Sequence, residues 1–304
     1  MAFTLYEYHK QQTDPIMAGV VEEFLDSRIL RYLPFKDIDG SAMTYNREES
    51  LPGIAFRAIN EAYDESTGII NPLTESLKIM GGDADTDKAL MKMEKNFGER
   101  RASDILMKTK AARTYFDKIF FDGDEASDPK QFDGLNKRLT GNQVITAGTN
   151  GANVIENMLD RLIDAVSGRP DALLMGKAMR RQLNNLAKGS TILTVGKDQW
   201  GDPVETYAGV PIGIVEEDND GNTILALDET QGSSSVTGSI YAVRFGINEW
   251  LCGIQNEPIE GVDLGEISSK PAFRYRMEWL MGIAIYNSKS AARLKGITAA
   301  SGIA

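Results

Sequence analysis

The segment that most constrains the fold of this chain is a long run of strand-forming residues near the C-terminus. Residues 273–287, FRYRMEWLMGIAIYN, combine aromatic, β-branched and arginine side chains and lead directly into SKSAARL at 288–294. Aromatic and β-branched residues are enriched in β-strands, so the segment predicts one long strand. A strand of this length is difficult to accommodate in a compact enzyme. It indicates a backbone element that spans a flat subunit.

Length and composition set the broad class of the protein. A chain of 304 residues buries roughly 75% of its unfolded surface and usually forms more than one lobe. Its hydrophobic content of 42% and charged content of 25% are typical of soluble globular proteins. No apolar run approaches the ~20 residues of a membrane helix, and residues 1–10 lack a signal-peptide pattern. We expect synthesis in a cytoplasm and no membrane partner.

Residue types that build common catalytic and metal sites are scarce. Cys252 is the only cysteine and His9 the only histidine. An intramolecular disulfide and a Cys-based zinc site are therefore excluded, and Ser-His, Cys-His and multi-His chemistries are nearly so. The formal net charge of −11 argues against a nucleic-acid reader. It suits a surface that lies near DNA without binding it.

The first 72 residues predict a helix followed by an extended excursion. Asp14 and Pro15 have the pattern of an N-cap and a first helical position, and an amphipathic helix is expected to end near Ser27. Alone it would be marginal, so it needs a partner surface from its own chain or a neighbour. Residues 40–72 predict two hairpin arms with strands at 42–45 and 54–59 and a polar tip. Either a surface loop or an arm lying on another subunit fits this pattern.

The next segment predicts a strand and then a long helix. Alternation over residues 73–79 indicates a strand that Gly81-Gly82 ends, and Asp83, Asp85 and Asp87 suit the N-terminus of a helix. The strongest helix spans about 99–120, roughly 30 Å. Its apolar seam continues for only about three heptads, which favours packing on a sheet over a coiled coil. The seam consists of Ala102, Ile105, Thr109, Ala112, Phe116 and Ile119.

The middle of the chain, 141–256, predicts a compact α/β lobe. Helices are expected at 152–167 and 177–188. Residues 80–140 and 257–304 would form a second lobe of one long helix and long strands. The strands expected in the middle lobe are 172–175, 191–195, 204–208, 210–215, 223–227 and 240–245, with a flexible loop at 231–235.

No sequence motif supports a catalytic, cofactor-binding or metal-binding residue. EEDNDG at 216–221 resembles the start of a calcium loop, but Leu227 occupies the position of the bidentate acid. Met175-Gly176-Lys177 lacks the first glycine of a phosphate loop, and Ser233–Ser235 have no histidine base. We expect no catalytic residue, no cofactor and no metal, and we expect that the protein is not an enzyme.

The order of these features resembles the major capsid proteins of tailed phages, which have the Hong Kong 97-like capsid fold. FDGD at 121–124 followed by FDGL at 132–135 is similar to the family's helix-end signature, and YAGVPI at 207–212 is similar to its Gly-x-Pro hairpin. Arg274-x-Arg276 and Ala291-Ala292 resemble its final strand and small-residue tail. The resemblance covers nearly the whole chain.

The resemblance implies an α+β fold with four parts. They are an N-terminal arm (1–39), an extended loop (40–72), a peripheral domain with a long spine helix (73–140 and 257–304) and an axial domain (141–256). The loop would lie across a neighbouring subunit and the arm would reach another. Arg274, Arg276 and Arg293 then become salt-bridge and interface residues rather than a phosphate site.

The resemblance also implies partners. It predicts hexamers and pentamers of one chain in an icosahedral shell that encloses double-stranded DNA. The further partners it implies are a portal and, in some shells, a decoration or cement protein. Because the arm begins almost at Met1, we expect a separate scaffolding protein or none. We expect no inter-subunit cross-link, because nothing in the sequence brings Lys and Asn residues together. The leading hypothesis is a virion capsid subunit. The alternatives are an encapsulin-type compartment shell and a soluble carboxylate- or Lys-dependent α/β enzyme.

Overall fold

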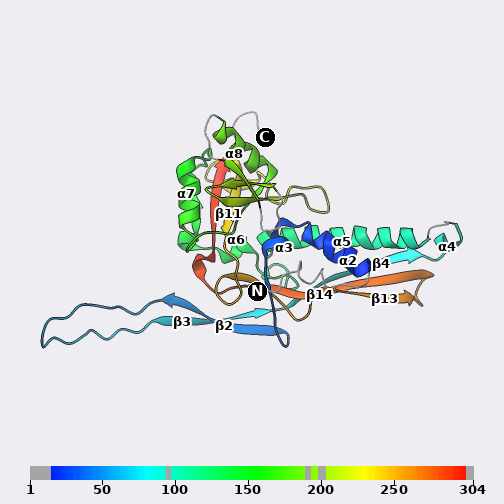
Figure 1. Cartoon of the computed structure of the whole chain (residues 1–304), viewed down its shortest axis with the longest axis horizontal. Helices are drawn as coiled ribbons and strands as arrows, with labels where there is room; N and C mark the ends of the chain where they lie inside the picture. Colours follow the sequence, from blue (N-terminus) through cyan, green and yellow to red (C-terminus); the bar gives the residue numbers. More distant parts are fainter. Residues whose placement is uncertain (1–14, 94–96, 189–192, 198–202, 299–304) are drawn as a thin grey trace.

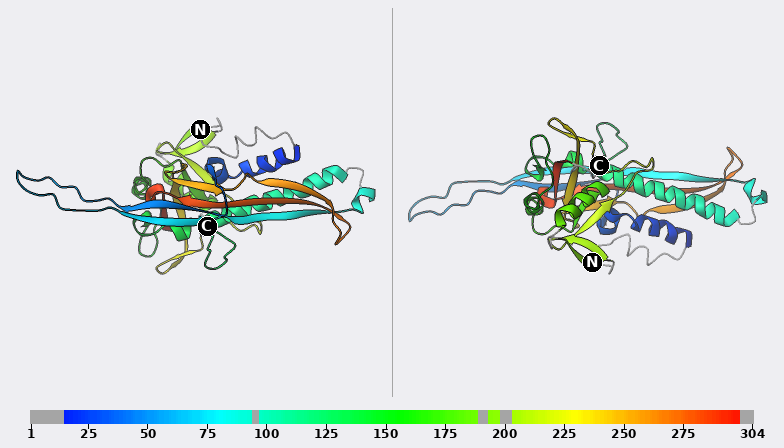
Figure 2. Two further views of the ribbon diagram at one scale, coloured as in Figure 1. Left: turned by 90° about the horizontal axis from the view of Figure 1, so that it is seen from below. Right: turned by 90° about the horizontal axis from the view of Figure 1, so that it is seen from above.

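The fold consists of two lobes and a long projecting hairpin. The computed structural model describes residues 15–93, 97–188, 193–197 and 203–298. In Figure 1 the α/β lobe with α7 and α8 lies above a long layer of helix and strands, and the hairpin β2–β3 extends to the opposite side from α5. Figure 2 shows that the hairpin and the long strands follow one axis of the molecule. The predicted α+β class is confirmed, and His9 lies outside the described residues.

The helices of the described residues are short except for one. The long helix is α5, Phe97–Asp122. The others are α2 Pro15–Leu25, α3 Arg28–Tyr32, α4 Leu90–Met93, α6 Leu135–Arg138, α7 Glu156–Asp164 and α8 Lys177–Ala187, with single 3₁₀ turns η1 Gly141–Gln143 and η2 Ser288–Ser290. None of these helices is long and apolar enough to cross a membrane.

The strands of the described residues form three sheets. The first has five strands, β1 Phe35–Asp37, β12 Leu251–Gln255, β14 Ala272–Ile285, β13 Glu260–Glu266 and β4 Lys78–Asp87. The hairpin consists of β2 Ala42–Ser50 and β3 Ile69–Ser76. The third has eight strands, β5 Val144–Thr146, β15 Ala291–Thr298, β11 Ser234–Val243, β6 Ala172–Gly176, β9 Val210–Val215, β8 Pro203–Tyr207, β7 Leu193–Lys197 and β10 Glu229–Gln231.

The long C-terminal strand is confirmed as β14, and it organises the first lobe. Alternate side chains, among them Tyr275, Met277 and Trp279, are buried because one face of a strand packs on the core. Trp279 packs against Phe35 and Phe116 with ring centroids 4.9 and 6.3 Å away. Its indole N–H donates to Gln255 Oε1 at 3.0 Å, so the buried polar atom is satisfied.

The spine helix α5 is longer than predicted but has the predicted seam. Ile105, Thr109, Phe116 and Ile119 are buried against the sheet, which confirms packing on a sheet. The helix ends at Asp122 because Gly123 and the chain after it turn back: Gly134 N donates to Gly123 O at 2.8 Å. A Cβ on Gly134 would lie 2.5 Å from Phe121 O, so only glycine permits this approach.

The N-terminal helix is confirmed, and it packs on its own chain. Val20, Val21 and Phe24 are fully buried, and Phe24 makes an edge contact with Trp279 at 5.8 Å between centroids. The partner surface that this marginal helix needs is therefore supplied by α5 and the first sheet. Residues 1–14 of the predicted arm lie outside the described residues.

The prediction that Gly81-Gly82 ends a strand and that Asp83, Asp85 and Asp87 begin a helix is wrong. All five residues lie in β4, which pairs with β14 without interruption from Lys78 to Asp87. The sequence GGDADTD alternates small or polar residues with acids, and Asp83 and Asp85 lie opposite Arg276 and Arg274 of β14. Long-range ion pairing therefore overrides the local preference of acids for helix N-termini.

Two further predicted strands are absent. Residues 54–59 have no regular structure, because the single chain offers them no neighbouring strand. Residues 223–227 form turns, with one isolated bridge from Thr223 to Glu217. In place of a loop at 231–235, β10 and β11 meet in a tight hairpin at Gly232, where φ is +60°. The predicted helix at 152–167 is shorter, and the strands at 172–175 and 210–215 are confirmed.

Two strands lie in a different sheet from the one that their place in the sequence suggests. β12, within 141–256, pairs with β14 in the first sheet. β15, within 257–304, pairs with β11 and β5 in the third sheet. The chain therefore passes between the lobes at 243–251 and again at 285–291.

Candidate assembly surfaces

The extended loop carries a set of large apolar side chains that are exposed in the subunit. Phe56 is completely exposed, and Ile54 is 96% exposed. Burial of large apolar side chains is the main source of association free energy, so such a set marks an interaction surface. The exposed large apolar residues of the hairpin are Leu51, Ile54, Phe56, Ile59, Tyr63, Ile69 and Ile70.

The base of the hairpin is fixed to the body by buried polar contacts. Arg138 donates two hydrogen bonds to the Glu75 carboxylate, at 2.5 and 2.7 Å, and both side chains are less than one-fifth exposed. Tyr45 O–H receives a hydrogen bond from Ile285 N at 3.2 Å, and its ring packs on Tyr286. Burial, with the nearby Glu75 carboxylate, raises the pKa of Tyr45 to about 12. The base of the hairpin is therefore fixed to the body of the subunit, while the apolar side chains of its outer part are exposed.

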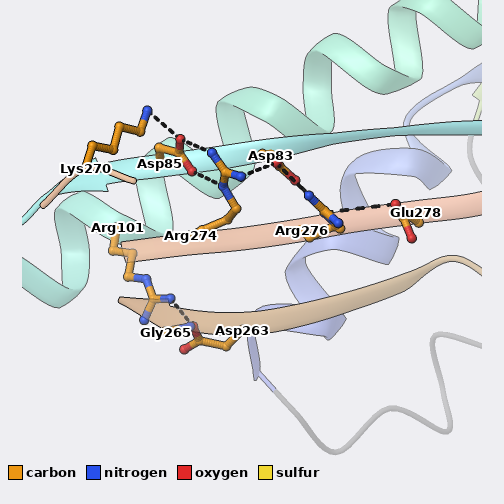
Figure 3. Close-up of polar contacts among 9 residues, drawn as sticks. All are labelled: Asp83, Asp85, Arg101, Asp263, Gly265, Lys270, Arg274, Arg276 and Glu278. Carbon is orange, nitrogen blue, oxygen red and sulfur yellow. Dashed lines mark hydrogen bonds and ion pairs between the residues drawn. The ribbon is translucent and has the colours of Figure 1, made fainter. Parts of the chain in front are cut away.

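An ion-pair ladder joins β4 to β14 on the face of the first sheet that lies away from α5 (Figure 3). Arg274 donates to both oxygens of Asp85, at 2.7 and 2.8 Å, and Arg276 does the same to Asp83, at 2.7 and 3.0 Å. Lys270 also contacts Asp85 at 2.6 Å. Hydrogen bonds from Arg274 and Lys270 lower the pKa of Asp85, and the Arg276 hydrogen bond lowers that of Asp83.

The salt-bridge roles expected for the three C-terminal arginines are confirmed within the subunit. Besides the pairs of Arg274 and Arg276, Arg293 in β15 contacts Glu229 at 2.9 Å and donates to Ser239 Oγ at 3.0 Å. Sequence reasoning found these arginines from their position in the closing strand. The acidic partners of Arg274 and Arg276 were missed because a separation of about 190 residues leaves no local signal.

A second polar cluster fastens the N-terminal helices to the spine helix. Arg113, 5% exposed, contacts Glu23 at 3.3 Å and forms a shorter ion pair with Asp26. Ser27 caps α3 and donates its hydroxyl proton to Asp117 at 2.6 Å. Burial raises the pKa of Asp117 to about 7, despite the opposing effects of Ser27 and Arg113.

The other residues considered from sequence have structural roles. Asp218 accepts from Asn222 N at 2.9 Å and pairs with Lys118 at 2.8 Å, which ties the acidic turn to the spine helix. Cys252 is fully buried, and burial raises its pKa to about 11. Gly176 approaches Leu225 O so closely that a Cβ would lie 2.4 Å away. The described residues contain no cluster of His, Cys, Asp and Glu that could hold a metal ion.

Comparisons with known proteins agree with this arrangement. The family model for major capsid protein GP7 matches residues 40–159. The chain is similar in structure to the SrpI encapsulin of Synechococcus elongatus PCC 7942, with 15% identity and a TM-score of 0.64 over 90% of this chain and 88% of that one. It is also similar to the capsid of the native GTA particle, with 13% identity and a TM-score of 0.61 over 89% and 90%. No curated protein matches the sequence.

A third similar structure is that of Mycobacterium phage Adephagia, with 11% identity and a TM-score of 0.61 over 90% of this chain and 91% of that one. These similarities show that the chain has the Hong Kong 97-like capsid fold. Together with the major capsid protein match, this fold confirms the resemblance to the tailed-phage major capsid protein family.

Proposed function

We propose that this chain is the major capsid protein that self-assembles into the icosahedral shell around the double-stranded DNA of a tailed phage. The extended hairpin is the observation that carries the proposal. Its seven large apolar side chains are exposed, while its base is held by the Glu75–Arg138 pair. At ~25 cal/mol per Å², burying them on a neighbour supplies substantial association free energy, repeated for every subunit.

The proposed parts of the subunit follow those expected from sequence: arm 1–39, extended loop 40–72, peripheral domain 73–140 and 257–304, and axial domain 141–256. Sheet membership supports moving β12 to the peripheral domain and β15 to the axial domain. The first sheet with α5 would then form the peripheral domain, and the eight-stranded sheet would form the axial domain. In this proposal the axial domains meet in hexamers and pentamers.

The proposed role is structural, with no catalysis, and the proposed location is the virion after synthesis in the host cytoplasm. The net charge of −11 supports a shell that encloses DNA without sequence-specific binding. A portal, a separate scaffolding protein and a decoration protein are the partners that such a shell would have.

An encapsulin-type compartment is the second candidate, because the SrpI encapsulin has the same fold at a TM-score of 0.64. The two candidates differ in content: a phage shell holds DNA and an encapsulin holds protein cargo. Nuclease-protected DNA in particles purified from phage-producing cells is the expected result. Particles that contain cargo protein and no DNA would favour the encapsulin.

Deletion of residues 44–66 tests the role of the hairpin. The deletion removes most of the exposed apolar side chains, together with Tyr45 at the hairpin base, and removes no residue of the two large sheets. We expect a folded, soluble subunit by circular dichroism that forms no closed shells in size-exclusion chromatography and negative-stain microscopy. Normal particles from the deleted protein would refute the assignment of the loop to inter-subunit contact.

A further inference from the structure

The root of the hairpin β2–β3 lies at the joint between the two lobes. It packs on a small apolar core that is separate from the two large ones. The chain passes between the lobes at 243–251 and at 285–291, and both passages border this core through Ile247 and Tyr286. The hairpin is therefore attached where the lobes are joined, and not to one lobe alone. The residues of the hairpin and the first sheet in this core are Met43, Tyr45, Leu73, Cys252, Ile254 and Ala284.

A cluster of side chains connects the hairpin to both passages. Lys36 Nζ donates to Asn248 Oδ1 of the first passage at 2.7 Å and to Tyr286 Oη of the second at 3.3 Å. The Tyr286 hydroxyl donates to Met43 Sδ at 3.6 Å. Tyr45 packs on Tyr286 with ring centroids 4.6 Å apart, and its oxygen accepts a hydrogen bond at 3.2 Å from the backbone N–H just before Tyr286. We call these residues, Lys36, Met43, Tyr45, Asn248 and Tyr286, the root cluster.

The two passages are also bonded to each other. Tyr286 N donates to Trp250 O at 3.1 Å. Arg244 N donates to Ser290 O at 2.7 Å. Because the passages are joined through their backbones, they form a firm support for the root cluster, and a side chain that contacts both of them is held in direction as well as in position.

The length of the hairpin makes the position of its tip sensitive to its root. Residues 46–60, from the root to the turn at the tip, span ~50 Å when extended. A rotation of about 5° at the root therefore moves the tip by roughly 4 Å. Side chains are in contact only when their heavy atoms lie within ~4.5 Å, so a displacement of this size is enough to lose a contact.

We propose that Lys36, Tyr45 and Tyr286 are positioning residues for shell assembly, which hold the hairpin in one direction relative to both lobes. This inference rests on the proposed shell function and gives a role in it to residues at the lobe joint, away from the exposed apolar side chains of the hairpin. A hairpin held in one direction has fewer positions to lose when it binds. The root cluster therefore lowers the ordering cost of association.

Energy transfer between two dyes on single, unassembled subunits measures the direction of the hairpin. One dye is attached at Phe56→Cys near the tip. The other is attached at Ile155→Cys, an exposed position at the start of α7 in the α/β lobe. The native Cys252 is fully buried and stays unlabelled. The distribution of dye-to-dye distances then reports how widely the hairpin moves relative to that lobe.

Two variants change the root cluster, and a third serves as the matched control. Tyr286→Phe removes the hydroxyl that contacts Lys36 and Met43. Lys36→Met removes the ammonium group and keeps an apolar stem. The control Tyr207→Phe also removes one tyrosine hydroxyl, which donates to Asp160 at 2.8 Å within the α/β lobe and away from the hairpin.

We expect a narrow distance distribution for the unmodified protein and for Tyr207→Phe, and a broader one for Tyr286→Phe and Lys36→Met, with native circular dichroism spectra throughout. The two root variants should also form shells several-fold more slowly at equal concentration. If Lys36→Met does not fold, Tyr286→Phe, which removes a single oxygen atom, decides the question.

Equal distributions in the unmodified protein and the root variants would overturn the positioning role. Shells that form at the unmodified rate despite a broadened distribution would also overturn it, and the shell function would stand. Failure of the unmodified protein to form shells would overturn the proposed function itself.

Discussion

The buried carboxyl of Asp117 should make the subunit less stable as the pH rises from about 4 to 7. The side chain lies between the spine helix and the N-terminal helices, where Ser27 donates a hydrogen bond to it at 2.6 Å. Burial raises its pKa from 3.8 to about 7. Between these two values the folded protein keeps a proton that the unfolded chain has lost. Raising the pH in this window therefore favours the unfolded chain.

The magnitude follows from the size of the pKa shift. Each pH unit in this window lowers the free energy of unfolding by ~1.4 kcal/mol. A shift of about three units in the pKa of Asp117 therefore lowers it by about 4 kcal/mol across the window. Asp117→Asn is neutral at every pH and its amide oxygen can still accept from Ser27. The free energy of unfolding of the wild type, minus that of the variant, should fall by ~1.4 kcal/mol per unit from pH 4 to pH 7 and then level off.

Urea unfolding of unassembled subunits at several pH values, followed by circular dichroism, measures this difference. Other carboxyl groups titrate in both proteins and cancel when the two curves are subtracted. A difference between wild type and Asp117→Asn that stays constant with pH would refute the assignment of a proton to the buried carboxyl.

Three further predictions concern the core, the spine-helix end and the hairpin base. Phe116→Asp should prevent folding, because it places an unpaired charge at a fully buried position, and an intact native circular dichroism spectrum for this variant would refute that expectation. Phe116→Ala should lower stability by about 3–5 kcal/mol. Gly134→Ala should lower stability by about 1–3 kcal/mol in thermal melts, because its Cβ meets Phe121 O. Gly98→Ala, whose Cβ has nothing within 4 Å, should stabilise the helix by ~0.5–1 kcal/mol, and equal effects of the two substitutions would contradict the packing argument. Arg138→Gln should lower the free energy of unfolding by on the order of 3 kcal/mol, because it leaves the Glu75 charge unpaired. A double-mutant cycle with Glu75→Gln should show coupling, and additive effects would mean that the pair does not hold the hairpin.

Local patterns predicted those elements whose burial repeats with a regular period. The spine helix has a seam at alternating spacings of three and four, and β14 has a long run of aromatic and branched residues. Both segments carry their own signal because each packs one face on a large core. The amphipathic N-terminal helix was predicted for the same reason, but its partner, α5, could not be identified from its own sequence.

The errors occur where distant residues decide the structure. Asp83 and Asp85 were interpreted as helix-start acids, although they alternate with Gly82 and Ala84 as strand residues do. Their strand is fixed by Arg274 and Arg276, far away in the sequence. Residues 54–59 have strand-forming side chains but no partner within one chain. The Ser27–Asp117 contact likewise joins residues 90 positions apart, so no local pattern reveals it.

Cryo-electron microscopy of the purified, full-length protein under assembly conditions tests the central claim most directly. The account predicts closed icosahedral shells in which the 51–68 segment of each subunit is buried on a neighbour. Monomers under all conditions, together with absence of the chain from virions, would contradict a capsid function.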